Sequence, residues 1–198
     1  MKNSKIIKIA CAGDSITENG YPANLQRMLG DGYEVVNFGV SGSTNLKGGT
    51  DHNSVDCDYR HKELYRASLD FNPDIVILML GTNDSKTMNW DRLGGNFVDD
   101  YLELIDTYKS LDSVKKIYLC TPPCAFSTAY EISPTAVERE VTVKVRETAK
   151  IAGLEIIDIY SATKGLESEF EDGIHPSTEK CRDAIAAACA DAVRKYNK

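Results

Sequence analysis

Three residue types that act together in nucleophilic catalysis occur in this sequence at positions typical of turns. Ser15 follows Gly13 and Asp14 directly after an apolar run, and His175 follows Asp172 by three residues in the segment EDGIHP. A serine hydroxyl is a weak nucleophile at neutral pH, so an imidazole must accept its proton and a third group must hold that imidazole in the correct tautomer. A turn can bring the carboxylate of Asp172 to Nδ1 of His175 and leave Nε2 free for Ser15. The spacing therefore predicts a Ser-His-Asp triad.

The same residues also have purely structural interpretations. Asp and Ser are common in turns and as helix N-caps, so Asp14 and Ser15 could serve only to start a helix. The Asp and His of EDGIHP could likewise be exposed loop residues. The other two histidines, His52 and His61, lie in a long polar segment and are expected at the surface or at the rim of a substrate site. The triad hypothesis therefore depends on other segments bringing partners to Ser15.

Candidate oxyanion donors follow three different apolar runs. Acyl transfer needs hydrogen-bond donors that already point at the place where negative charge develops, and each contributes roughly 10²- to 10³-fold in rate. The backbone N–H groups of Ser15 and Gly39 and the side-chain amide of Asn83 are the candidates. A single Gly or Asn of this kind is more typical of an ordinary turn. Their joint position after successive runs favours the oxyanion hypothesis.

Five short apolar runs alternate with helical patterns along the chain. The expected strands are residues 5–12, 33–40, 73–81, 115–121 and 154–160. The expected helices are residues 21–30, 59–70, 93–110, 133–152 and 177–196. Several runs are apolar throughout, which is typical of strands covered on both faces in a parallel sheet. The alternation predicts a single three-layer α/β/α sandwich domain over residues 1–198, with a five-stranded, mostly parallel sheet whose strand order the sequence leaves open.

This architecture gives the candidate residues a reason to meet. The carboxyl ends of parallel strands share one edge of the sheet, and ligands bind there. Ser15, Gly39, Asn83 and the EDGIHP loop all follow expected strands. We therefore expect one site at this edge.

Composition narrows the possible partners and compartments. A net charge of −7 disfavours nucleic acid as a partner, and no apolar run approaches the ~20 residues of a membrane span. The six cysteines form no CxxC pair and are expected to be reduced and buried; Cys120 and Cys124 have no nearby His, which disfavours zinc. No metal or cofactor is expected. The amino-terminal apolar stretch is short for a signal peptide, so we expect a cytoplasmic protein, although removal of a leader would leave the same sequence.

Four sequence blocks together resemble the SGNH, or GDSL, hydrolase family. They are GDSIT around Ser15, NFGVSGST around Gly39, GTND around Asn83, and DGIHP around Asp172 and His175. The resemblance implies a flavodoxin-like sheet and ester hydrolysis by an acyl-enzyme route. It also implies that Ser15 is nucleophile and oxyanion donor, that Gly39 and Asn83 complete the oxyanion hole, and that His175 is the base oriented by Asp172.

Two details refine the resemblance. Ile16 stands where the GDSL pattern has Leu, an apolar exchange that leaves the chemistry untouched, and the GxSxG elbow of α/β-hydrolases is absent. The stretches YPANLQRML and GTNDSKTMNW look most like carbohydrate O-acetylesterases and acetylxylan-esterase-like members. Asp14 and Trp90 are the expected substrate contacts, with Trp90 as a platform for a sugar ring, although a single Trp is more often packed as hydrophobic cover.

The expected substrate is a small-molecule or carbohydrate ester with a short acyl group, foremost acetyl. Two alternatives remain open at this point. One is a lysophospholipase or thioesterase of the same family, which would need an apolar groove beside Ser15. The other is a non-catalytic flavodoxin-like domain that binds a ligand at the sheet edge, although neither GxGxxG nor a phosphate loop occurs. The oligomeric state is left open.

Overall fold

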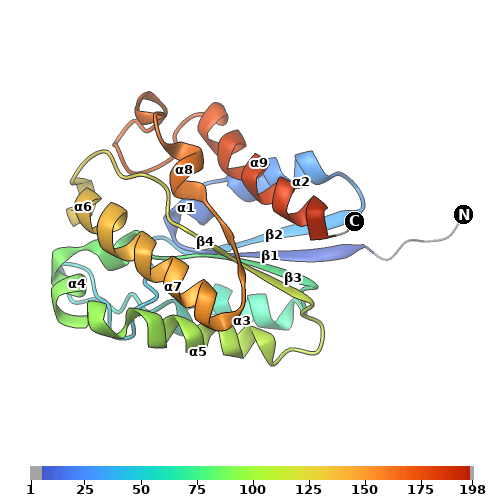
Figure 1. Cartoon of the computed structure of the whole chain (residues 1–198), viewed down its shortest axis with the longest axis horizontal. Coiled ribbons are helices and arrows are strands. Elements are labelled where there is room, and N and C mark those ends of the chain that lie inside the picture. The colour runs from blue at the N-terminus through green and yellow to red at the C-terminus, as the bar shows by residue number, and fades with distance from the viewer. Residues whose placement is uncertain (1–5, 197–198) are drawn as a thin grey trace, which may run out of the picture.

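A parallel sheet forms the centre of the computed structural model, which describes residues 6–196 (Figure 1). The strands are β1 (Ile7–Gly13), β2 (Tyr33–Gly39), β3 (Ile75–Met79), β4 (Lys116–Cys120) and β5 (Glu155–Ile157). The sheet has five strands in the order β2-β1-β3-β4-β5, and every neighbouring pair is parallel. This is the flavodoxin-like order. The predicted α/β fold is confirmed; residue 5, at the start of the first expected strand, lies outside the described residues.

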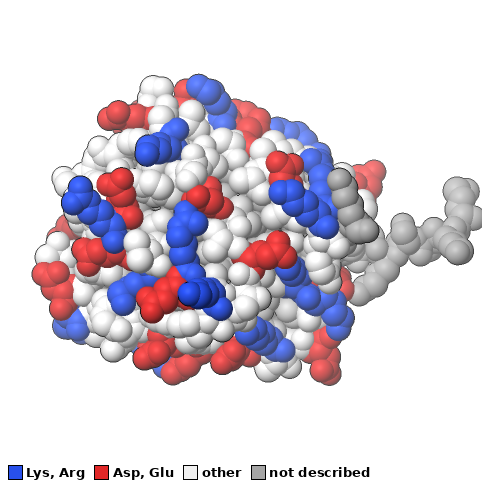
Figure 2. Space-filling view, viewed as in Figure 1, with Lys and Arg blue, Asp and Glu red and all other residues white. Residues whose placement is uncertain are grey.

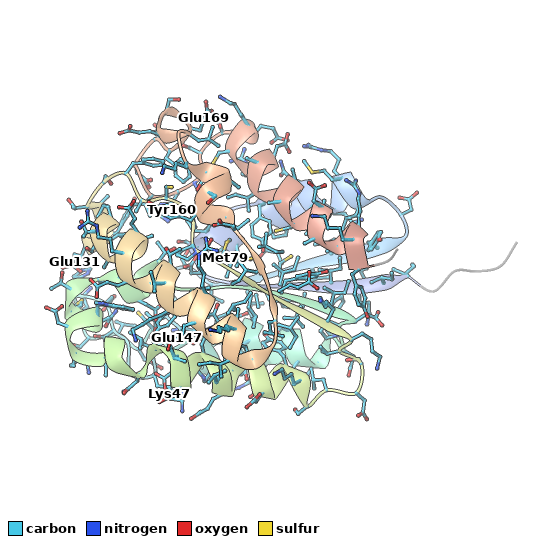
Figure 3. The ribbon with its side chains drawn as sticks, in the orientation of Figure 1. Lys47, Met79, Glu131, Glu147, Tyr160 and Glu169 are labelled. Carbon is cyan, nitrogen blue, oxygen red and sulfur yellow. The ribbon has the colours of Figure 1, made fainter. Side chains whose placement is uncertain are left out.

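Helices cover both faces of the sheet, as the continuous apolar runs predict. The helices are α1 (Ser15–Glu18), α2 (Tyr21–Leu29), α3 (Glu63–Asp70), α4 (Thr87–Leu93), α5 (Phe97–Lys109), α6 (Pro134–Ala136), α7 (Thr142–Ala152), α8 (Ile159–Thr163) and α9 (Glu179–Tyr196). In β3, Val76 and Leu78 pack against α3, α5 and α7. Ile75, Ile77 and Met79 pack against α2 and α9 on the other face, and Met79 is labelled near the centre of Figure 3. The buried strand thus joins two apolar cores.

The structure adds short helices at the carboxyl edge that the sequence patterns did not predict. Helix α1 follows β1 almost directly, α4 follows β3 after a 3-10 turn, and α8 replaces the second half of the expected strand 154–160. The strand ends there because the side chain of Asp158 accepts a hydrogen bond from the backbone N–H of Ser161 and caps α8. The expected helix 133–152 is divided into α6, a π-helical segment over residues 137–141, and α7. These changes concentrate at the left of Figure 1, where the strands end.

Gly39 is required by close packing at this edge. A Cβ at Gly39 would lie 2.2 Å from the backbone nitrogen of Glu18 and 2.8 Å from its Cα. Those atoms belong to α1, which therefore approaches the end of β2 too closely for any side chain. This contact fixes α1, and Ser15 at its start, against the sheet.

The surface carries charges of both signs. Figure 2 shows Lys and Arg interspersed with Asp and Glu over this face of the molecule. Within residues 6–196, no helix is both long and apolar enough to cross a bilayer.

A buried carboxylate ties two loops of the carboxyl edge together. Asp84 is fully buried and accepts hydrogen bonds from the backbone N–H groups of Asn45 (3.1 Å) and Leu46 (2.7 Å). Asn45 and Leu46 lie in the loop after β2, whereas Asp84 lies in the short 3-10 turn after β3. Its position holds the two loops in register.

We expect Asp84→Ala to lower the free energy of unfolding by roughly 2–4 kcal/mol. The substitution leaves two buried N–H donors without acceptors, and each such loss costs about 1–3 kcal/mol. Urea denaturation measures the change, and Asp112→Ala, at an exposed position, is the matched control. A loss no larger than that of Asp112→Ala would contradict the proposed role of Asp84.

Candidate active site

The structure brings Ser15, His175 and Asp172 into one chain of hydrogen bonds. Nε2 of His175 lies 2.9 Å from Oγ of Ser15, and Nδ1 lies 2.6 Å from Oδ2 of Asp172. A carboxylate only accepts, so Nδ1–H donates to Asp172 and Nε2 is left to accept from the hydroxyl of Ser15. This is the tautomer that proton transfer from serine requires.

The turn before His175 holds the carboxylate of Asp172 in place. Oδ1 of Asp172 accepts from the backbone N–H groups of Ile174 (2.8 Å) and His175 (2.7 Å). Gly173 has a φ of +78°, and a Cβ there would lie 2.6 Å from Ser127. Only glycine fits this turn without strain.

The charge state of Asp172 follows from these contacts. Partial burial acts to raise its pKa, but hydrogen bonds from the backbone and imidazole of His175 and from Ile174 outweigh burial and lower the pKa to about 2. Asp172 is therefore ionised at neutral pH. An ionised carboxylate at Nδ1 stabilises the imidazolium that forms when His175 accepts a proton.

Asp14 lies beneath the site and not on its surface, which corrects the expectation that it contacts substrate. Its side chain is 1% exposed, and Oδ1 accepts from the backbone N–H of Ile16 at 3.0 Å, capping α1. Oδ2 is buried without a hydrogen-bond partner among the described residues. Burial, together with the nearby charge of Asp84, raises the pKa of Asp14 to about 7 although the hydrogen bond from Ile16 acts to lower it. Asp14 thus positions Ser15, which itself is 7% exposed.

Gly39 is not placed as an oxyanion donor, which corrects a second expectation. Its backbone N–H donates to Oδ1 of Asn37 at 2.9 Å. Gly42 lines the cavity beside Ser15 instead, has a φ of +77°, and has no atom within 4 Å of where a Cβ would lie. Its N–H has no hydrogen-bond partner among residues 6–196, so it is free to donate to a ligand. The signal was present in the same block, in the second glycine of NFGVSGST.

Asn83 does line this cavity. It is buried, and its amide nitrogen donates one hydrogen bond to the backbone oxygen of Ser43 at 3.2 Å. The amide has two N–H groups, so a second remains for a ligand. The N–H groups of Ser15, Gly42 and Asn83 thus border one space.

Trp90 does not form the expected sugar platform. It is 9% exposed, its ring packs 5.5 Å from that of Phe97, and its indole N–H donates to Glu140. These contacts make it part of the core beside α5.

Of the remaining histidines, His61 is exposed and pairs with Asp56, and His52 lines a neighbouring cavity.

The cavity beside Ser15 has a volume of about 300 Å³ and a mixed lining. Ile132 and Ile174 supply apolar surface, and Tyr130 stands at its rim with 59% of its surface exposed. The Tyr130 ring packs edge-on against the imidazole of His175, with centroids 5.3 Å apart. Lys86 also lines the cavity. Neither Tyr130 nor Lys86 stood out in the sequence.

No cluster of three or more His, Cys, Asp or Glu suited to a metal ion occurs in the part of the chain that the structure describes.

The chain belongs to the GDSL-like lipase/acylhydrolase family, whose sequence profile matches residues 11–179. A curated relative, an acetylxylan esterase from Xylanibacter ruminicola, is 35% identical over an alignment 212 residues long. The alignment covers 92% of this chain. This chain spans only 43% of the length of that relative.

Solved structures share the fold at lower identity. A carbohydrate acetylesterase from Sinorhizobium meliloti superposes with a TM-score of 0.76 at 20% identity, covering 96% of this chain and 99% of that one. An aryl esterase from M. smegmatis gives a TM-score of 0.70 at 22% identity, covering 96% and 99% of the two chains. The sheet and its helices are thus common to several esterases.

We expect the stability of the protein to fall as pH rises from about 4 to about 7, in part through Asp14. Its pKa is about 7 in the folded protein and 3.8 ordinarily, so the folded state binds the proton more tightly, and the stability gained at low pH is lost as pH rises through the folded pKa. Asp84, whose pKa burial also raises to about 7, contributes in the same direction.

Asp14→Asn removes one of these two groups, so its free energy of unfolding should fall less over this pH range. Urea denaturation at several pH values measures the slope. Asp51→Asn is the matched control, because hydrogen bonding to the backbone N–H of Val55, more than any other contact, lowers the pKa of Asp51. An unchanged slope in Asp14→Asn would show that Asp14 is ionised throughout this range.

Proposed function

We propose that this chain is a serine esterase that removes short acyl groups, foremost acetyl, from a polar alcohol such as a carbohydrate. The observation that carries the proposal is the hydrogen-bonded chain from Ser15 through His175 to Asp172, which opens into a small cavity bordered by free N–H donors. Family membership and the acetylxylan esterase relative support the same chemistry.

The geometry suits a two-step reaction. Oγ of Ser15 attacks the ester carbonyl carbon while its proton passes to Nε2 of His175, and the carbonyl oxygen becomes an oxyanion held by the N–H groups of Gly42 and Asn83. When the tetrahedral intermediate collapses, the C–O bond to the alcohol breaks and His175 returns the proton to the departing oxygen. Water then attacks the acyl-enzyme by the same path, releases the acid and restores Ser15. Asp172 stays ionised and stabilises the imidazolium in both steps.

The dimensions of the cavity favour a short acyl group. About 300 Å³ must hold the acyl group and part of the alcohol, and the apolar lining is limited to a few side chains, including Ile132 and Ile174. Each methylene of a longer chain contributes only about 0.8 kcal/mol when fully buried, and an exposed chain forfeits that gain.

Alanine variants of Ser15 and Asn83 test the proposed chemistry. With 4-nitrophenyl acetate, Ser15→Ala should lower kcat by about four orders of magnitude or more, because the nucleophile is lost. Asn83→Ala should lower kcat roughly 10²- to 10³-fold, because one oxyanion donor is lost while the triad remains.

Ser110→Ala, at an exposed position after α5, is the matched serine control. Hydrolysis that survives Ser15→Ala would contradict the esterase proposal and favour a binding domain. An unchanged kcat in Asn83→Ala would remove Asn83 from the mechanism.

The acyl preference separates the proposal from its alternative within the family. We expect kcat/KM to fall along the series 4-nitrophenyl acetate, butyrate and octanoate, because longer chains extend beyond the cavity and misplace the carbonyl relative to Ser15. Initial rates at equal enzyme concentration measure the series. A rise toward octanoate would instead indicate a lysophospholipase or thioesterase.

A further inference from the structure

Lys86 is a largely buried lysine whose ammonium group forms no direct contact with another polar group among the described residues. The residue is 7% exposed, and its ammonium group forms no hydrogen bond or ion pair with any residue in 6–196. Lys86 lies between the 3-10 turn Asn83–Ser85 and α4. Lysine is rarely buried unless it is paired, because removing its charge from water is costly. Folding stability therefore gives no reason for a lysine at this position.

The side chain lies where two cavities meet. Lys86 lines the cavity of Ser15 and also a second cavity of about 650 Å³. Ser41, Gly42 and Tyr130 line both cavities as well, so the two spaces share one wall. A ligand whose ester carbonyl lies at Ser15 can thus extend past Lys86.

No carboxylate among residues 6–196 forms an ion pair with Lys86, although the charge of Lys86 is close enough to help lower the pKa of Asp51. Asp51, Asp56 and Glu131 line only the second cavity, where Glu131 is labelled at the left edge of Figure 3. Asp56 pairs with His61 at 2.6 Å, and Asp51 accepts two backbone hydrogen bonds of 2.9 Å. No carboxylate lines the first cavity, so its lining is positive at Lys86.

We propose that Lys86 binds a carboxylate of the substrate, and that the preferred substrate is the acetyl ester of an acidic sugar of the uronic-acid class. This inference rests on the esterase proposed above. A single ammonium group matches the single charge of a carboxylate, and a charge-assisted hydrogen bond to it replaces the water that Lys86 loses on burial. The exposed Tyr130 ring at the shared wall provides a flat apolar surface for the face of a sugar ring.

The test compares acetate release from two substrates that differ only in charge. One is a monoacetylated methyl glucuronoside, and the other is the same compound with its carboxyl group converted to the uncharged methyl ester, which has the same ring and the same acetyl group. The ratio of kcat/KM for the acid to that for the ester should be about 10 to 100, the range expected of a hydrogen bond to a charged group. Lys86→Met should bring this ratio to about 1, whereas Lys86→Arg should keep it well above 1.

Lys62→Met is the matched control. Lys62 also lines the second cavity, but its ammonium group already donates to the backbone oxygen of Asp56 at 2.6 Å, so this variant loses the same net charge without losing the proposed contact and should keep the ratio. A ratio near 1 in the unmodified protein would overturn the inference. So would a ratio that persists in Lys86→Met or disappears in Lys62→Met.

The design also separates other roles of Lys86. If the lysine only stabilised the oxyanion or the local fold, Lys86→Met would lower kcat/KM for both substrates equally and leave the ratio unchanged, which would overturn the inference. Ser15-dependent hydrolysis of 4-nitrophenyl acetate with a ratio of 1 would reject the acidic sugar alone. Hydrolysis that does not depend on Ser15 would reject the esterase proposal itself.

Discussion

The site depends on the hydrogen bonds through which the buried carboxylate of Asp84 joins two loops. Asn45 and Leu46, which it binds, lie only a few residues beyond Gly42, and Asp84 itself follows Asn83 directly. The N–H groups of Gly42 and Asn83 lie in loops that follow different strands. They can both point at one ligand oxygen only if these loops keep a fixed separation. Burial raises the pKa of Asp84 to about 7, against the two hydrogen bonds that favour its ionised form. Burial of Asp84 is therefore electrostatically unfavourable. In return, its hydrogen bonds hold the loops of Gly42 and Asn83 in place, so that the proposed donors need not move during the reaction.

Ser15 is positioned by a second buried carboxylate, that of Asp14, and by the close approach of α1 to Gly39, which has no side chain. Asp14 caps α1 at its first turn, and the absence of a Cβ at Gly39 lets the same helix lie against the end of β2. Neither residue faces the cavity. The GDS segment thus has a structural and a chemical role, because Asp14 caps the helix and Ser15 is the residue that hydrogen-bonds to His175.

The sequence was informative wherever a local pattern determines the outcome. The apolar runs located all five strands, and the three-residue spacing of Asp172 and His175 defined a turn that fits their hydrogen bond. The sequence was uninformative where contacts with distant segments determine the position of a side chain or the partner of an N–H group. Trp90 packs against Phe97 in the core and donates its indole N–H to Glu140, 50 residues away, and no local pattern contains that contact. The sequence predicts Gly39 as an oxyanion donor, and only the structure shows that its N–H already donates to Asn37.

Backbone strain occurs in the segment that carries Tyr130 at the rim of the cavity. Tyr130 and Glu131 have φ values of +55° and +63°, a conformation that costs of order 1–3 kcal/mol at each non-glycine residue and persists only where the surroundings enforce it. The result is an exposed ring held edge-on against His175, at the wall shared by both cavities. Lys86 reaches the same wall from the turn that carries Asn83. Since one short turn supplies both Asn83, the proposed oxyanion donor, and Lys86, a ligand bound to Lys86 would be fixed relative to that donor, and the proposed recognition would be coupled to the orientation of the reacting carbonyl.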